Sequence, residues 1–228
     1  MNNNIELKNL YKIYDHKNVE VLNNINFKFK KGKIYSLMGP SGSGKSTLLN
    51  LISLIDRPTK GKVKIENKDI NFNENKINDK IRANKIGIIY QEKNLLADFT
   101  ALENVYLARL SIENNKDRAV EDAIKIIKKV GLQSRIDHYP SELSGGEAQR
   151  VAISRALINS PDIILADEPT GSLDQKNSKE IFKILFNLRS DSRTIIFATH
   201  NRYFADLADC KIELIDGKIK IINVRIKK

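Results

Sequence analysis

The chain has 228 residues, of which 41% are hydrophobic, 29% are charged and one is a cysteine, and its formal net charge is +11. This length fits one large domain with a substantial core, so we assign residues 1–228 to a single domain. One cysteine excludes an internal disulfide framework, and the apolar surroundings of Cys210 predict a buried structural thiol in a reducing compartment.

The N-terminal sequence MNNNIELKNLYKIY lacks the apolar segment of a signal peptide. No run reaches the roughly 20 apolar residues that cross a bilayer. The lysines are scattered and few aromatic residues lie among them, so we interpret the positive charge as a general surface property. No nucleic-acid partner is expected.

Alternating patterns in the first 35 residues and in GKVKIENKDINF (61–72) predict short antiparallel strands. Four continuous apolar runs, each ending at a polar residue, predict strands of a parallel sheet that is buried on both faces. These runs are IYSLM (34–38), IGIIY (86–90), DIILA (162–166) and TIIFAT (194–199). Ligands bind such sheets beyond the carboxyl ends of the strands.

Helical periodicity follows Lys45 and recurs over residues 117–130 and 178–188, with Gly131 as a stop signal. Asparagine and lysine dominate residues 66–85, which we predict to be an exposed, mobile connection. The C-terminal segment 218–228 is basic and alternates with isoleucine and valine, a pattern typical of an edge strand.

The strongest motif is GPSGSGKS (39–46), which follows a predicted strand and opens a predicted helix. Backbone N–H groups of such a loop converge on phosphate, and the helix N-terminus adds positive charge. Lys45 is predicted to reach the β- and γ-phosphates, and the Ser46 hydroxyl to bind Mg²⁺. The predicted nucleotide contacts here are Gly39, Pro40, Ser41, Gly42, Ser43, Gly44, Lys45, Ser46 and Thr47.

In IILADEP (163–169) two adjacent carboxylates, Asp167 and Glu168, lie at the end of a predicted buried strand. We predict that Asp167 binds the Mg²⁺ shell and that Glu168 accepts a proton from an attacking water. Gln91 and His200 each end another of the predicted strands. Gln91 is predicted to bridge metal and water, and His200 to contact the γ-phosphate and orient the base.

An aromatic face for stacking on adenine is available in YKIYD, where Tyr14 is the first candidate and Tyr11 the rival. Packing alone also accounts for either ring.

LSGGE (143–147) combines a helix start with two glycines. Ser144 and Glu147 match the capping box S-x-x-E, which satisfies free N–H donors at a helix start. The cap does not explain Gly145 and Gly146, since glycine costs about 1 kcal/mol in a helix. Bare N–H groups there predict a second anion site, suited to a phosphate that arrives from outside.

Together these motifs resemble the ATP-binding subunits of ABC transporters over essentially the whole chain. The matching motifs are Walker A (39–47), the Q-loop (Gln91), the signature (143–147), Walker B (ILADE, 164–168), the D-loop (Ser172–Asp174) and the switch histidine (His200). The resemblance implies an α/β fold: a P-loop parallel sheet, an N-terminal antiparallel β portion and a helical insertion at about 93–159.

The same resemblance implies hydrolysis of ATP with Mg²⁺ and a homodimer that sandwiches two nucleotides. In such a dimer the signature of one copy closes on the Walker A motif of the other, and Asp174 of the D-loop joins the nucleotide site. Because such a dimer has two-fold symmetry, each chain contributes its signature to the nucleotide site of its partner and receives the partner's signature at its own site.

YQEKNLLADFTALENV (90–105) most resembles the lipoprotein-releasing branch of this family, with macrolide-exporter and division-associated ATPases as alternatives. That branch implies integral membrane permease partners similar to LolC and LolE, and a peripheral place on the cytoplasmic face of the inner membrane.

Two other classes fit less well. A nucleic-acid-acting ABC ATPase has support only from the basic charge, and the long coiled coil or duplicated domain of such proteins does not occur here. A P-loop kinase or small GTPase does not account for the LSGGE motif. A small GTPase is further disfavoured because the chain lacks the N-K-x-D motif that recognises guanine.

Overall fold

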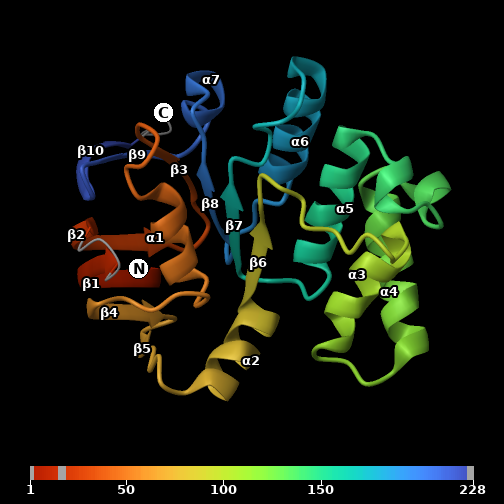
Figure 1. Cartoon of the computed structure of the whole chain (residues 1–228), viewed down its shortest axis with the longest axis horizontal. Helices are drawn as coiled ribbons and strands as arrows, with labels where there is room; N and C mark the ends of the chain where they lie inside the picture. Colours follow the sequence, from red (N-terminus) through yellow and green to blue (C-terminus); the bar gives the residue numbers. More distant parts are fainter. Residues whose placement is uncertain (1–2, 15–18, 225–228) are drawn as a thin grey trace.

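The computed structural model describes residues 3–14 and 19–224. Its strands form two sheets with helices between and beside them (Figure 1). The four-stranded sheet has the order β2-β1-β4-β5, and the six-stranded sheet has the order β10-β9-β3-β8-β7-β6. The strands are β1 (Asn3–Tyr14), β2 (Val19–Lys30), β3 (Ile34–Met38), β4 (Lys60–Ile65), β5 (Lys68–Asp69), β6 (Ile86–Ile89), β7 (Ile163–Asp167), β8 (Thr194–Ala198), β9 (Cys210–Ile215) and β10 (Lys218–Val224).

The expected parallel sheet is present, because β6, β7, β8 and β3 pair in parallel. Strand β9 extends it in parallel beside β3, and β10 closes one edge antiparallel to β9. The antiparallel portion also agrees with the sequence prediction, since β1 pairs antiparallel with both β2 and β4. The predicted edge strand at the C-terminus is confirmed to Val224, and residues 225–228 lie outside the described residues.

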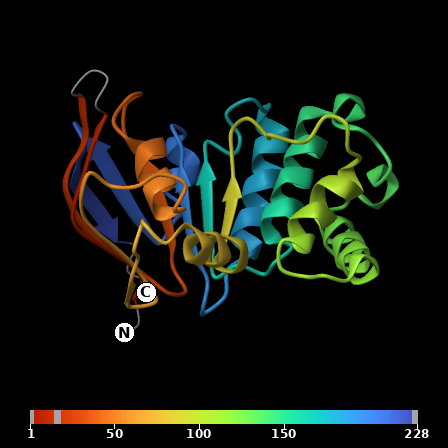
Figure 2. The same cartoon turned by 60° about the horizontal axis from the view of Figure 1, so that its bottom comes forward.

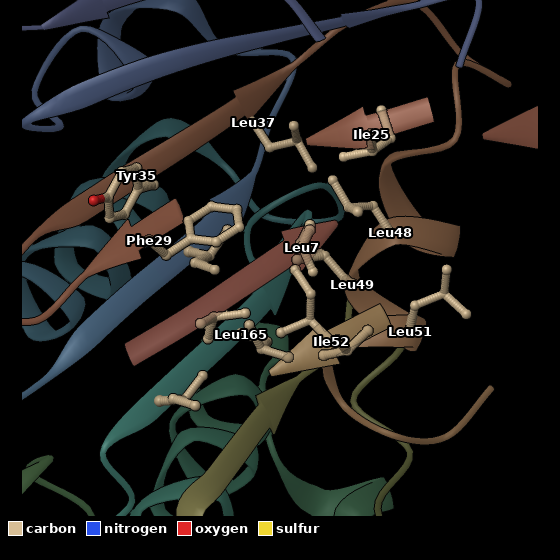
Figure 3. Close-up of a cluster of buried hydrophobic side chains, with 14 of the residues drawn as sticks. Leu7, Ile25, Phe29, Tyr35, Leu37, Leu48, Leu49, Leu51, Ile52 and Leu165 are labelled. Atoms are coloured by element: carbon tan, nitrogen blue, oxygen red, sulfur yellow. The ribbon is translucent and has the colours of Figure 1, made fainter. Parts of the chain in front are cut away.

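Helix α1 (Lys45–Ile52) lies between the two sheets and fills the space with leucine and isoleucine (Figure 3). Its buried side chains meet Leu7 and Ile25 from the antiparallel sheet and Leu37 from the parallel sheet. Burial of each such side chain stabilises the fold by about 1.5–3 kcal/mol. Cys210 is buried in the same core, as predicted.

The prediction of an exposed, mobile connection over residues 66–85 is wrong for the second half of this segment, which forms helix α2 (Asn75–Lys85). Polar side chains dock this helix: Asn78 is buried and donates to the Asn71 carbonyl, and Arg82 donates to the Leu54 carbonyl. Ile81 packs against the hydrophobic core but Ile77 is exposed, so the helix lacks the repeated apolar positions by which a sequence usually indicates one.

A group of helices lies beyond the β6 edge of the parallel sheet (Figure 2). Its members are α3 (Ala101–Leu110), α4 (Lys116–Lys129), η2 (Gln133–Arg135), η3 (Pro140–Glu142) and α5 (Gly145–Leu157). They enclose a separate buried cluster that includes Val105, Ala123 and Val151. Gly131 follows α4 with φ 77°, the left-handed geometry expected of a helix stop.

Helix α6 (Gln175–Asn187) begins three residues before the predicted start at Ser178, because Asp174 caps it by accepting from the Lys176 and Asn177 N–H groups. The short α7 (Arg202–Ala205) follows β8. Among the described residues, no helix is long and apolar enough to cross a membrane.

Candidate nucleotide site

The loop 39–44 connects β3 to α1 and has the geometry of a phosphate cradle. Gly39 has φ 147°, and a Cβ there would lie 2.1 Å from the Leu214 carbonyl oxygen, so this position requires glycine. No side chain caps the N-terminus of α1, so its first N–H groups can bind an anion. The Lys45 Nζ donates to the carbonyls of Gly39 and Pro40 at 2.9 and 3.0 Å, which places its charge inside the loop.

The hydroxyl-bearing residues of this loop differ in exposure. Ser41 and Ser46 are exposed and Thr47 is half-buried. Ser43 is buried, and its Oγ has no hydrogen-bond partner among the described residues. Ser46 is therefore accessible to a ligand bound in the loop, as its predicted role requires.

The two carboxylates lie at the carboxyl end of β7. Asp167 Oδ1 is buried and has no hydrogen-bond partner in the described parts of the chain. Such an orphaned anionic acceptor is costly unless a cation or donor joins it, so the site fits Mg²⁺. Glu168 has φ 44°, a strained conformation for a residue with a side chain, and its N–H donates to the Ala198 carbonyl of β8.

His200 follows β8 and faces Glu168. Its Nε2 lies 3.2 Å from Glu168 Oε1, within ion-pair distance, although the angle does not qualify as a hydrogen bond. His200 lines two hollows: one of about 680 Å³ that Gln91 and Glu168 also line, and one of about 580 Å³ that Gly39 and Pro40 line. The structure thus brings these predicted residues together at one edge of the parallel sheet.

Tyr14 ends β1 at the edge of the β1–β2 ribbon that contacts the phosphate loop. It pairs with Val19 in the sheet, and a Cβ on Gly44 would lie 2.9 Å from the Val21 carbonyl two residues further on. The ring is exposed, its hydroxyl is 3.0 Å from Asp56 Oδ2, and the Lys12 ammonium sits 4.7 Å above it. This placement favours Tyr14 as the stacking candidate.

The rival Tyr11 is half-buried and pairs with Lys60 of β4, three residues before Tyr14 on the same strand. Its position beside β4 favours a packing role.

The signature begins α5 with the predicted capping box. Ser144 Oγ accepts from the Glu147 N–H at 3.3 Å, and Glu147 Oε2 accepts from the Ser144 N–H at 2.8 Å. The Ser144 bonds and the Arg135 guanidinium, 2.9 Å from Glu147 Oε1, lower the pKa of Glu147 to about 2. The cap is therefore ionised at neutral pH, where a carboxylate also suits the helix dipole.

The two signature glycines have close neighbours in their own chain, which the sequence did not indicate. A Cβ on Gly146 would lie 2.5 Å from Asn177 Oδ1, and a Cβ on Gly145 would lie 3.3 Å from Leu173 Cδ2. Asn177 is itself hydrogen-bonded to Asp174, the α6 cap. The α5 N-terminus and the D-loop therefore pack directly on each other, which gives Gly146 a second reason to lack a side chain.

Helices α1 and α5 lie on opposite sides of the parallel sheet (Figures 1 and 2). The glycines of the signature are consequently remote from the phosphate loop of the same chain.

Two polar side chains of α5, the buried Gln149 and the half-buried Arg155, contact the chain around Gln91 but were not predicted. Gln149 is 1% exposed and donates to the Tyr90 carbonyl, and Arg155 donates to the carbonyls of Lys93 and Asn94. Both flank Gln91 in space. In the sequence they are polar residues on either side of the apolar or small run VAIS (151–154), where Arg150 and other polar helix residues also lie, so nothing singles them out.

Comparison with known proteins agrees with this site. The family model described as ABC transporter matches residues 22–171. A lipoprotein-releasing system ATP-binding protein LolD of Rickettsia bellii is 44% identical over 95% of this chain and 97% of its own length. An uncharacterized ABC transporter ATP-binding protein of Methanocaldococcus jannaschii is also 44% identical, over 96% of this chain and 99% of its own length.

Among solved structures, the ATP-binding cassette MJ0796, as a dimer in a post-hydrolysis state bound to ADP and Pi, is 39% identical. It covers 96% of this chain and 98% of its own length with a TM-score of 0.90. These matches extend over both sheets and the helical group. The chain therefore belongs to the ATP-binding proteins of the ABC transporter family.

Proposed function

We propose that this chain hydrolyses ATP as the energising subunit of a lipoprotein-releasing ABC transporter. The observation that carries the ATPase proposal is the convergence of Glu168, His200 and Asp167 at the carboxyl ends of β7 and β8, beside the phosphate loop. Hydrolysis needs an acceptor for the proton of water close to bound phosphate, and the Glu168 carboxyl group is placed to serve as one.

In the proposed reaction, the Lys45 ammonium and the α1 N-terminus bind the β- and γ-phosphates. Asp167, Ser46 and Gln91 would hold Mg²⁺, which neutralises phosphate charge when bound. Glu168 accepts a proton from the attacking water. His200, 3.2 Å from that carboxylate, orients it and donates toward the γ-phosphate.

A homodimer completes the proposed site. The matched cassette structures are dimers, and in this chain the signature lies across the sheet from its own phosphate loop. In the proposed dimer, the N–H groups of Gly145 and Gly146 bind the γ-phosphate held by the partner copy, and Asp174 lies beside the same nucleotide. ATP binding then closes the two copies, and hydrolysis separates them.

The proposed partners are integral membrane permeases of the LolC and LolE type, and the proposed location is the cytoplasmic face of the inner membrane. LolD relatives from Rickettsia bellii and Cytophaga hutchinsonii support this assignment, each 44% identical. In this assembly the chain supplies energy, and the permeases bind the lipoprotein.

Affinity purification of the tagged chain from membranes tests the partner assignment. We expect it to retain integral proteins with few spans and a large periplasmic domain. Proteoliposomes containing the purified complex should release a bound lipoprotein on addition of Mg-ATP, and a complex with Glu168→Gln should not. Recovery of a cell-wall hydrolase regulator, or lipoprotein retention despite ATP turnover, would contradict the proposal.

A further inference from the structure

Arg155 on α5 forms hydrogen bonds with the backbone of the loop that follows Gln91. Its Nη1 donates to the Asn94 carbonyl at 2.6 Å, and its Nη2 donates to the Lys93 carbonyl at 2.8 Å. The Arg155 side chain is half-buried, and this partial burial lowers the pKa of its guanidinium. A planar guanidinium suits two adjacent acceptors, and charge-assisted hydrogen bonds are stronger than neutral ones.

The same helix also holds the chain just before Gln91. Gln149 is 1% exposed, and its Nε2 donates to the Tyr90 carbonyl at 3.3 Å. Helix α5 therefore contacts the backbone on both flanks of Gln91.

The other side of this loop rests on the segment that follows Glu168. A Cβ on Gly171 would lie 2.8 Å from Gln91 Nε2, so the Gln91 amide lies directly on the Gly171 backbone. Lys93 Nζ donates to Ser172 Oγ at 3.0 Å. The loop is thus enclosed between α5 and the D-loop segment.

Helix α5 is itself fixed against the parallel sheet at the level of Arg155. A Cβ on Gly87 of β6 would lie 2.4 Å from the Ala156 carbonyl oxygen, so the strand and helix backbones approach as closely as glycine permits. The guanidinium of Arg155 is therefore carried by a backbone that is held in place.

We propose that Arg155 is a positioning residue for ATP hydrolysis, which fixes the Lys93 and Asn94 carbonyls and thereby the place at which Gln91 presents its side-chain amide. The inference rests on the proposed function, in which Gln91 contacts the metal and the attacking water. Through Arg155, Gln91 is tied to the helix that carries Gly145 at its N-terminus. Displacement of α5 would then move Gln91 out of position.

Hydrogen exchange of the free protein, followed by mass spectrometry, tests whether the Arg155 hydrogen bonds hold this loop in place. Arg155→Ala should speed exchange of residues 91–96 at least about fivefold, because two backbone acceptors lose their donors. Arg155→Lys should produce a smaller increase, since an ammonium can serve one carbonyl. The control Arg118→Ala removes an exposed arginine of α4 and should leave this loop unchanged. Unchanged exchange in Arg155→Ala would overturn the inference whatever the ATPase rate.

Steady-state kinetics test the positioning role. Arg155→Ala should lower kcat about tenfold and raise the Mg²⁺ concentration for half-maximal rate, because a small misplacement is costly in catalysis. Its affinity for a fluorescent ATP analogue in EDTA should stay within about twofold, and Arg155→Lys should recover part of the rate. In a Gln91→Ala background, Arg155→Ala should cause no further loss.

Two kinetic outcomes would overturn the inference. Losses that multiply in the double variant would mean that Arg155 does not act through Gln91. A wild-type rate in Arg155→Ala, with faster loop exchange, would remove the catalytic role. If instead Gln91→Ala alone shows wild-type kinetics, the proposed role of Gln91 is wrong, and the positioning role of Arg155 is wrong with it. The exchange experiment still shows whether Arg155 holds the loop in place.

Discussion

Gly87 sets the distance between the edge strand β6 and the signature helix α5, and its replacement by alanine should disturb both stability and turnover. The added Cβ would meet the Ala156 carbonyl oxygen at 2.4 Å and Pro161 Cγ at 2.9 Å. A backbone oxygen cannot rotate away as a side chain can. Helix and strand must therefore separate by about 1 Å before the added Cβ and this oxygen reach an ordinary van der Waals distance.

The size of the effect follows from two opposing terms. Overpacking a buried contact costs about 1–3 kcal/mol, and a backbone partner places Gly87→Ala in the upper part of that range. The same substitution stabilises the strand by about 0.5–1 kcal/mol, because glycine loses more conformational entropy than alanine when it folds into a strand. The net loss is about 1–2.5 kcal/mol, which for a domain of this size lowers Tm by roughly 2–10 °C.

Differential scanning calorimetry and ATPase assays measure the two consequences. Gly131→Ala is the matched control, because its cost of about 1–2 kcal/mol comes from a φ of 77° and its nearest other atom is 3.9 Å away. Both variants should lose Tm, but only Gly87→Ala should lower kcat per folded molecule, since it moves α5. A Tm for Gly87→Ala within about 1 °C of wild type would refute the reasoning.

Three further changes test the site. Glu168→Gln should bind ATP, lose turnover by a factor of about 10²–10⁴, and accumulate as an ATP-bound dimer in size-exclusion chromatography; a monomer at saturating Mg-ATP would contradict this. Gly145→Asp should spare nucleotide binding and abolish hydrolysis, because a carboxylate repels the incoming phosphate; an unchanged ATPase rate would exclude the shared site. The pKa of Glu147 falls from 4.5 to about 2 on folding, so its stabilisation is complete above pH 4.5 and is lost as the pH falls toward 2. Thermal unfolding of Glu147→Gln should therefore depend less on pH across that window, and identical pH dependence would show that the cap carboxylate does not contribute.

The sequence by itself determined the parallel sheet and which polar residues lie at the carboxyl ends of its strands. Strands β3, β6, β7 and β8 are largely buried on both faces, so their sequences are nearly continuous apolar runs, and each run ends beside a residue predicted to belong to the site. Parallel strands place these ends at one edge, which is why a polar residue after each run predicts a common site. The capping box of α5 could also be predicted from the sequence, because it depends on two residues that are only three positions apart.

Helix α2 and the contacts around Gln91 were decided only by the tertiary structure. Asn78 and Arg82 hold α2 through hydrogen bonds to the carbonyls of Asn71, seven residues earlier, and Leu54, 28 residues earlier, and such bonds produce no apolar periodicity in the sequence. Likewise, Arg155 meets carbonyls about 60 positions earlier in the chain. Local patterns encode local hydrogen bonds and burial, whereas a side chain that binds a remote backbone acquires its role only when folding brings the two segments together.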